Sequence, residues 1–281
     1  MHRIGSAVCA GIVAVGAVLA PTAQAQLGNP DDPFAPAGPR ASVRLALEHE
    51  RLTPGPQELA VVFDIEPGWH LYWKNPGDTG MPPSVTLTLP ESVTQTGEIL
   101  WPMPERYVHG GGALLDYIHE GTLTLLVPID VDAAAAGSAV TIEAEAEWLV
   151  CKEECLPESG TARLTADVRT SAGEKSAEAD LFRVTRERLP RPTKRLHVGW
   201  NGHTLMLNAP GSTHMQYFPL EPDIGGPAQL VADGAVRGST LRVRFDPRVS
   251  DAERVRGVVA IGRGLRVQYE ILDETPPPAG R

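Results

Sequence analysis

The sequence is short of basic residues, of cysteine and of long apolar runs. It has 25 Lys and Arg against 35 Asp and Glu, which gives a formal net charge of -10. A nucleic-acid-binding protein needs a basic face to meet the phosphates, so the acidic balance argues against that class. After residue 25, no apolar run approaches the roughly 20 residues that a membrane-spanning helix needs. We therefore expect a mature protein that is soluble and does not itself span a membrane.

Residues that break helices are, by contrast, abundant. The 281 residues include 28 Gly and 26 Pro. Because both residue types destabilise a helix interior, this composition excludes a coiled coil or a helical bundle. The hydrophobic content of 42% and the charged content of 21% argue against global disorder. The composition therefore indicates a β-rich, acidic protein of one or two domains.

The N-terminus has the pattern of an export signal. A short basic segment is followed by an apolar run over residues 8–20, and Ala23-Gln24-Ala25 supplies a small-x-small cleavage pattern. The apolar run is too short for a membrane anchor, which needs roughly 20 residues. We expect residues 1–25 to be a signal peptide cleaved after Ala25, and the mature protein to be periplasmic or secreted.

Only two cysteines remain once the signal peptide has left. Cys9 lies in the apolar run and should depart with it, which leaves Cys151 and Cys155. Exported compartments are oxidising enough for disulfides to persist. The count of two cysteines in an exported chain therefore favours one disulfide and no free thiol.

Alternation of apolar and polar residues predicts a series of strands after a Pro-rich, flexible lead-in over residues 26–40. The alternating runs lie near residues 43–47, 59–65, 85–89, 123–129, 140–148 and 162–168. This period of two is typical of half-buried antiparallel strands. Six or more short strands between Gly/Pro turns favour a β-sandwich, which we place over residues 41–170.

A helix and a second β domain are predicted after the sandwich. Ala177, Leu181, Val184 and Arg188 are spaced near 3.6 residues within 174–188, so we expect a helix in a linker over residues 171–192. Strand-like runs then resume near residues 196–200, 204–208, 215–220, 241–245, 255–261 and 265–272. These runs predict a second, smaller β domain over residues 193–274 and a tail over 275–281.

The strongest chemical signal is the pair Cys151 and Cys155 in WLVCKEECLPE. Cys151 ends a predicted strand, and Cys155 follows a short polar turn. A turn of that size can bring two Cα atoms within the range of about 4.4–6.8 Å that a disulfide needs. In the chain-entropy model, closing so short a loop stabilises a domain by only about 2 kcal/mol. We therefore favour a redox pair over a structural disulfide.

The local sequence predicts a poor nucleophile. A thioredoxin-type attacking thiol lies in C-x-x-C at a helix N-terminus, whereas this C-x3-C follows a strand. Glu153 and Glu154 lie between the cysteines, and negative neighbours raise the pKa of a thiol. The pair therefore suits a relay that is reduced by one partner and passes electrons to another by thiol–disulfide exchange.

Metal and cofactor sites have less support. A c-type haem site needs C-x-x-C-H, which this sequence does not contain. A zinc or copper site would need histidines from elsewhere, such as His70, His109 or His119, so we assign no metal and no cofactor. His109-Gly110-Gly111-Gly112 resembles a lipase oxyanion loop, but no G-x-S-x-G accompanies it, and we expect a flexible loop.

Three stretches resemble a known family. GWHLYWKNPGDTG at residues 68–80, Trp101-Pro102 and WLVCKEECLPE at residues 148–158 are similar to the N-terminal periplasmic domain of DsbD-type protein-disulfide reductases. The similarity is greatest to the ScsB-like subgroup, which is linked to suppression of copper sensitivity. It covers roughly residues 40–170 well and the second β domain more loosely. Within the first stretch, we expect Trp69, Tyr72 and Trp73 to pack in the core.

The resemblance implies an immunoglobulin-like sandwich that takes electrons from a membrane-embedded domain through a thioredoxin-like domain. It hands them to periplasmic oxidoreductases. It implies that Cys155 forms the mixed disulfides and that Cys151 resolves them. It also implies a cap loop, here at Pro104–Gly111, in which Tyr107 covers the sulfurs. Tyr107 and His109 of this loop, with the two glutamates between the cysteines, are the predicted modulating residues.

The family's membrane-embedded and thioredoxin-like domains do not appear in these 281 residues. We therefore expect a separate membrane-embedded thiol reductase, or a separate thioredoxin-like domain, as the electron donor, and periplasmic thioredoxin-fold oxidoreductases as clients. Two alternatives remain open. One is a noncatalytic β-sandwich that binds partners and holds a structural disulfide, and the other is a periplasmic copper-binding or copper-tolerance protein.

Overall fold

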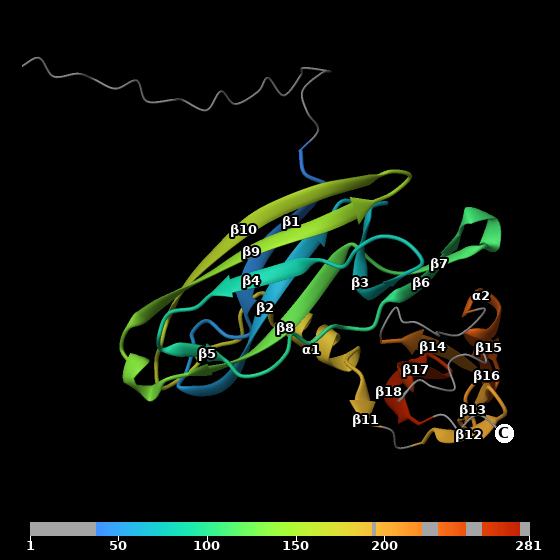
Figure 1. Cartoon of the computed structure of the whole chain (residues 1–281). Coiled ribbons are helices and arrows are strands. Elements are labelled where there is room, and N and C mark those ends of the chain that lie inside the picture. Colours follow the sequence, from blue (N-terminus) through green and yellow to red (C-terminus); the bar gives the residue numbers. More distant parts are fainter. Residues whose placement is uncertain (1–37, 193–194, 221–229, 246–254, 276–281) are drawn as a thin grey trace, which may run out of the picture. The chain divides into compact units, whose positions relative to one another are not determined.

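The computed structural model describes residues 38–192, 195–220, 230–245 and 255–275 (Figure 1). The predicted signal peptide, most of the lead-in and most of the tail lie outside these ranges. Residues Pro39–Arg281 form one compact unit. The described part contains no helix that is long and apolar enough to cross a membrane. Strands dominate it, which confirms the all-β prediction.

Residues 41–167 form two antiparallel sheets that face each other as a sandwich (Figure 1). The four-stranded sheet has the order β1 (Ala41–Leu47), β2 (Gly55–Ile65), β8 (Thr122–Val131) and β5 (Val93–Gln95). The six-stranded sheet has the order β10 (Cys155–Asp167), β9 (Ala139–Cys151), β3 (His70–Gly77), β7 (Leu114–Glu120) and β6 (Glu105–His109), and β4 (Ser84–Thr88) also pairs with β9.

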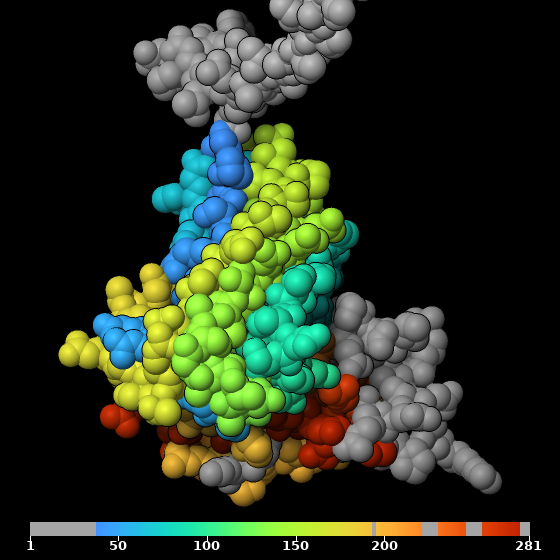
Figure 2. Space-filling model, turned by 90° about the vertical axis from the view of Figure 1, so that its left-hand side faces the viewer, coloured from blue at the N-terminus to red at the C-terminus, as the bar shows by residue number. Residues whose placement is uncertain are grey.

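The sandwich core explains the alternation in the sequence. Inward-facing residues of the two sheets meet in one apolar cluster, in which Phe63 of β2 and Trp148 of β9 pack edge to face with ring centroids 5.4 Å apart. Figure 2 shows β9 and β10 crossing one face of the sandwich beside β4. Trp69, Tyr72 and Trp73 are all buried, as predicted.

The predicted helix is shorter than expected and buries a different face. α1 spans Ala179–Glu187, and its buried residues are Ala179, Phe182 and Thr185. The prediction placed the apolar stripe on Ala177, Leu181 and Val184, but Ala177 and Val184 are exposed. Phe182 instead packs on outward-facing small and branched residues of β1, β2 and β8, so the helix covers the outer face of the four-stranded sheet.

Residues 191–274 form a second pair of sheets. One has the order β11 (Arg191–Pro192), β18 (Arg266–Glu274), β17 (Val255–Arg263), β14 (His214–Pro219) and β15 (Ala235–Arg237). The other contains β12 (His197–Asn201), β13 (Thr204–Asn208) and β16 (Thr240–Arg244), and a short helix α2 spans Leu230–Asp233. All six predicted strand runs of this region are confirmed.

Direct contacts join the two pairs of sheets. Trp73 of β3 and Tyr117 of β7 share an apolar cluster with Phe218 of β14, and the rings of Tyr117 and Phe218 are 5.4 Å apart. The buried side chain of Asn75 donates a hydrogen bond of 2.9 Å to the backbone oxygen of Pro219. The second region therefore packs against β3 and β7, two strands that also carry the candidate site.

Candidate functional site: a disulfide at the end of a hairpin

Cys151 and Cys155 form a disulfide, as the cysteine count predicted. Cys151 is the last residue of β9, and Cys155 is the first residue of β10. The two are directly opposite each other in the antiparallel ladder, with Cα atoms 4.1 Å apart. From there the pairing runs without a break to Asp167 and Ala139. The disulfide therefore links two strands that the backbone already holds together.

The two cysteines differ in exposure. Cys151 is only 2% exposed and packs against Tyr72, Ile118 and Leu149 on the outer face of the six-stranded sheet. Cys155 is exposed. Cys155 is thus open to solvent, whereas Cys151 is shielded by its neighbours.

The turn between the cysteines is polar and exposed. The backbone N–H of Lys152 donates to the backbone oxygen of Glu154 at 3.0 Å, which closes the turn. The ammonium group of Lys152 lies over Gly68, where an added Cβ would meet Nζ at 3.5 Å. Glu153 and Glu154 are both exposed. Their modulating role stays a prediction.

Strand β3 supplies the polar groups next to the disulfide. His70 is paired with Cys151, and the hydroxyl of Tyr72 lies 3.8 Å from Sγ of Cys155. A disulfide sulfur carries no proton, so this hydroxyl is the donor. Burial raises the pKa of Tyr72, which therefore keeps its proton at neutral pH. Burial lowers the pKa of His70, which favours the neutral ring.

The predicted cap segment is mostly ordered structure. Pro104–Gly111 contains strand β6, and the glycines that follow His109 form a 3-10 turn at Gly110–Gly112 rather than a loop without structure. Tyr107 stacks on His109 with ring centroids 5.1 Å apart and lies 5.4 Å from the ring of His70. Tyr107 thus reaches His70, the residue opposite Cys151 in the ladder, and a covering role for Tyr107 over the sulfurs stays a prediction.

Asp116 of β7 is 1% exposed and belongs to no motif that the sequence predicts. Its Oδ1 accepts a hydrogen bond of 2.8 Å from the backbone N–H of Thr79, and its Oδ2 accepts one from the Thr79 hydroxyl. The same Oδ2 is 3.0 Å from Nε2 of His109. Tyr107 and Asp116 are opposite each other in the β6–β7 ladder, which places this carboxylate beside the cap segment. No local motif reveals that pairing.

The three histidines considered as metal ligands do not converge. In the ladder between β3 and β7, His70 is opposite Glu120 and His119 is opposite Leu71, so the two rings lie on opposite faces of the sheet. His119 is buried, and burial lowers its pKa to about 3. Among the residues that the structure describes, no group of three or more His, Cys, Asp or Glu side chains is placed to hold a metal ion.

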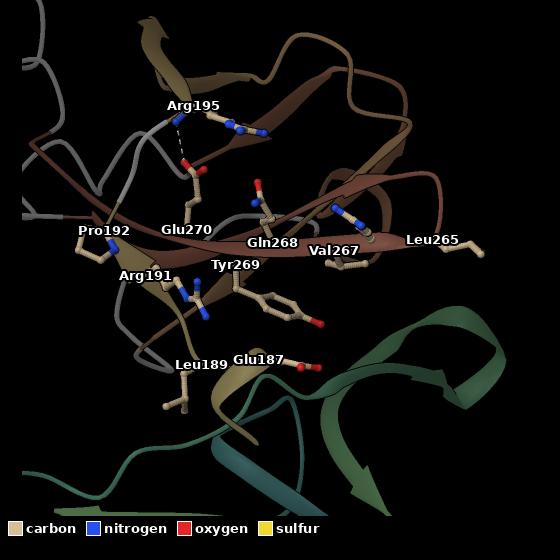
Figure 3. A pocket seen from close by; sticks show the side chains of 11 residues that line it. Glu187, Leu189, Arg191, Pro192, Arg195, Leu265, Val267, Gln268, Tyr269 and Glu270 are labelled. Carbon is tan, nitrogen blue, oxygen red and sulfur yellow. Dashed lines mark hydrogen bonds between the residues drawn. The ribbon is translucent and has the colours of Figure 1, made fainter. Parts of the chain in front are cut away.

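A separate groove of about 970 Å³ lies away from the cysteines (Figure 3). Its lining side chains come from the end of α1, from β11, from β18 and from the segments next to them, and they include Arg191, Arg266 and Tyr269. The backbone N–H of Arg195 donates to Glu270 at 3.2 Å on one side of it. Neither cysteine lines this groove, so it does not belong to the candidate redox site.

Comparisons with known proteins agree with this geometry. Residues 42–167 match the family model described as thiol:disulfide interchange protein DsbD, N-terminal. The chain is also similar to the N-terminal periplasmic domain of ScsB from Proteus mirabilis, with 12% identity and a TM-score of 0.54 over 84% of this chain and 92% of that one. At that identity the likeness shows the fold alone.

Two further solved structures match weakly. The major pilin subunit BcpA of Bacillus cereus has 10% identity and a TM-score of 0.26 over 84% of this chain and 66% of that one. The mouse nectin-like molecule 4 ectodomain has 15% identity and a TM-score of 0.21 over 85% of this chain and 65% of that one. Neither score carries an argument. No curated protein sequence matches the chain. The family match falls on the first two sheets: residues 42–167 match the DsbD N-terminal domain family and form an immunoglobulin-like sandwich.

Proposed function

We propose that this protein is a periplasmic thiol–disulfide interchange module that relays electrons through Cys151 and Cys155. The observation that carries the proposal is a disulfide with one exposed and one buried cysteine at the end of a continuous hairpin. The family of residues 42–167 supports the same chemistry. Because the ladder already pairs β9 with β10, a disulfide at its end adds little to the fold, which favours a redox role over a structural one.

The relay transfers two electrons in two exchange steps. In the reduced protein, the Cys155 thiolate attacks a sulfur of the client's disulfide, a new intermolecular S–S bond forms, and the client's other sulfur leaves as a thiolate. The Cys151 thiolate then attacks Sγ of Cys155, which restores the disulfide and releases the reduced client. The released thiolates take their protons from water. A donor dithiol returns the module to its reduced form by the reverse steps.

The unequal exposure of the cysteines supports this assignment of roles. A mixed disulfide forms only when the partner's sulfur reaches the sulfur of one of the two cysteines. Cys155 is the exposed cysteine. Cys151 is 2% exposed and meets Cys155 only from within the protein. The proposed clients are periplasmic thioredoxin-fold oxidoreductases, and the proposed donor is a separate membrane-embedded thiol reductase or a thioredoxin-like domain.

The reduction potential tests the proposal. The protein is equilibrated in glutathione redox buffers, the thiols are trapped, and the reduced fraction is measured. We expect a potential within the span from DsbA to the glutaredoxins, roughly -120 to -230 mV. A potential below about -300 mV contradicts the relay and favours the noncatalytic sandwich with a structural disulfide. Reduced protein must also pass electrons to an oxidised thioredoxin-fold protein, while the double Cys→Ala variant must not.

A further inference from the structure

Strand β18 is paired along its whole length on one side only. All nine of its residues are opposite residues of β17. On its other side, β11 reaches only Glu270 and Ile271. Among the residues that the structure describes, no strand pairs with β18 beside Arg266–Tyr269 on that side. This half of the strand is therefore an open edge of the five-stranded sheet.

The hairpin that joins β17 to β18 determines which backbone groups face the open edge. Arg263 and Arg266 close a two-residue turn, so they form the first hydrogen-bonded pair of the ladder. Hydrogen-bonded and non-hydrogen-bonded pairs alternate in an antiparallel ladder, so Val267 and Tyr269 direct their N–H and C=O groups away from β17. The described residues offer Val267 no backbone partner on that side. A sheet edge of this kind can be extended by a further strand.

The groove described above follows this edge. Side chains from both faces of β18 line it, because Gln268 and Glu270 lie on one side of the strand and Tyr269 lies on the other (Figure 3). A pocket on one face of a sheet is lined by every second residue of a strand, since successive side chains point to opposite faces. Leu189, from the segment between α1 and β11, also lines the groove. The open space is therefore beside the strand, where an added strand would lie.

The two faces of β18 differ in character along the groove. Leu265, Val267 and Tyr269 alternate in sequence with Arg266 and Gln268. Leu265, which precedes the strand, is fully exposed, and Val267 is 38% exposed. The side chains of an added strand also alternate between the two faces. Such a strand would therefore meet apolar side chains on one face and basic or polar side chains on the other.

The charges at the groove favour an acidic occupant. Arg191, Arg195 and Arg266 line it and are all exposed, and within the described ranges none of the three has an ion pair. The two carboxylates of the lining are already engaged. Glu187 accepts a hydrogen bond of 3.0 Å from an arginine of its own helix, and the buried Glu270 accepts two of 3.2 Å from backbone N–H groups. The groove is therefore a basic surface on a protein with a formal net charge of -10.

We propose that the open edge of β18 binds an extended acidic segment of a partner protein as an added strand. Backbone pairing with Val267 and Tyr269 holds the segment against the sheet. Its Asp or Glu side chains form charge-assisted hydrogen bonds with Arg266 and the neighbouring arginines, and its apolar side chains, at the alternate positions, pack on Leu265 and Val267. This surface is separate from the cysteines. It holds a partner, and its binding does not depend on the exchange reaction.

Selection of displayed peptides tests the proposal. Short random peptides are selected for binding to the purified, oxidised protein, and the enriched peptides are synthesised. We expect them to contain Asp or Glu in alternation with branched apolar or aromatic residues. Arg266→Glu should weaken their binding about tenfold in fluorescence anisotropy, and so should the replacement of their Asp and Glu by Asn and Gln. Bound peptide should slow amide hydrogen exchange at Val267 and Tyr269.

Two variants separate strand addition from attraction between charges alone. Val267→Pro removes the N–H that faces the open edge and changes no charge, so it should abolish binding. Arg237→Glu changes an exposed arginine of β15, the strand at the opposite edge of the same sheet, and should leave binding as it is. Circular dichroism verifies that each variant is folded.

Three results would overturn the proposal. They are the enrichment of no peptide, the enrichment of peptides without acidic residues, and equal binding to the wild type and Arg266→Glu. The last comparison does not need Val267→Pro to fold. A variant with both Cys151→Ala and Cys155→Ala should bind the peptides as the wild type does, so the result is independent of whether the relay operates.

Discussion

The two pairs of sheets have the same construction but bury different kinds of side chain. Each has its own apolar core, and all strand pairs within the described sheets are antiparallel except the short parallel pair β11–β18. Within the described residues, the first pair buries five polar or charged residues, His70, Asn75, Asp116, His119 and Thr124. The second pair, over residues 195–275, buries Ser212 and Glu270.

The difference shows where the chain buries polar groups in addition to apolar side chains. Burying a polar group costs free energy unless it is hydrogen-bonded, so such groups are retained where they have a role. Four of the five in the first region lie on β3 and β7, the strands next to the cysteines. The second region contacts the same strands with Phe218 and the backbone of Pro219. The buried polar groups of the first region therefore gather on β3 and β7, whereas the second region contacts these strands through an aromatic side chain and a backbone oxygen.

The largest expected effect concerns the roles of the two cysteines in the first region. Cys151→Ser leaves the exposed Cys155 able to attack but removes the thiol that resolves the intermediate, so mixed disulfides with a thioredoxin-fold partner should accumulate. Cys155→Ser should trap almost none. Nonreducing gel electrophoresis after incubation with the oxidised partner measures both. Equal trapping by the two variants would contradict the assigned roles.

The second prediction tests whether the two regions unfold together. Phe218 is 1% exposed and packs with Trp73 and Tyr117 of the first region. Phe218→Ala should lower the free energy of unfolding by about 3–5 kcal/mol. Urea unfolding followed by tryptophan fluorescence should still show one transition, displaced to lower urea.

Phe245→Ala is the matched control for that variant, because Phe245 is 6% exposed and packs only in the second core. The opposite result is two unfolding transitions in Phe218→Ala. If the core of residues 41–167 stays folded through the first of them, the two regions are independent folding units.

The third prediction is a pH dependence that arises in the first region. Burial, and secondarily Arg188, lower the pKa of His119 to about 3. The native state therefore keeps His119 neutral, whereas the unfolded chain protonates it below about pH 6.5. Stability should fall as the pH is lowered from 6.5 towards 3, by about 2 kcal/mol between pH 7 and pH 5 from this residue.

Denaturant unfolding at a series of pH values measures this dependence. His119→Leu should remove this part of the slope, whereas a substitution of the exposed His197 in the second region should leave the slope as it is. An identical slope in wild type and His119→Leu would show that other groups cause the acid sensitivity.

The smallest expected effect is that of the turn carboxylates. Two unit charges a few ångströms apart near a surface interact by a few kcal/mol at an effective dielectric of about 20, and exposure reduces this strongly. Glu153→Gln combined with Glu154→Gln should therefore lower the pKa of the Cys155 thiol by up to about one unit. Iodoacetamide labelling of reduced protein at several pH values measures the shift. An unchanged midpoint would mean that these carboxylates point away from the sulfur.

Alternation is clearest in the strands that have one face in the core. β10 alternates strictly between exposed and less exposed residues, and β9 nearly so, which is why the period of two was visible in these strands. β2 and β8 are buried on both faces but are mostly apolar, so they were still predicted as strands. β3 and β7 were missed because their buried runs also contain polar residues. Residues His70–Trp73 and Leu115–His119 are all buried, so alternation is lost where the sheet meets the cap and the second region.

The site was predictable only where its residues are close in sequence. The spacing of Cys151 and Cys155 revealed the disulfide, since a four-residue separation limits the turn. Asp116 and Thr79 are 37 positions apart, and only the close approach of residues 75–80 to β7 brings them together. A single aspartate in a strand forms no sequence motif from which its contacts could be predicted. The helix face was misjudged for a related reason, because Phe182 packs on small residues that are distant in sequence.

The position of the disulfide at the end of the β9–β10 ladder has a consequence for the rate of exchange. When the S–S bond breaks, the backbone hydrogen bonds that pair Leu156 with Val150 and the residues beyond them remain. The two sulfurs are therefore kept at a high effective concentration with respect to each other, because neither strand has to be repositioned. In the proposed relay, a mixed disulfide at Cys155 faces the Cys151 thiol across one rung of the ladder. Its lifetime is then set by the thiolate fraction of Cys151 rather than by a search through conformations.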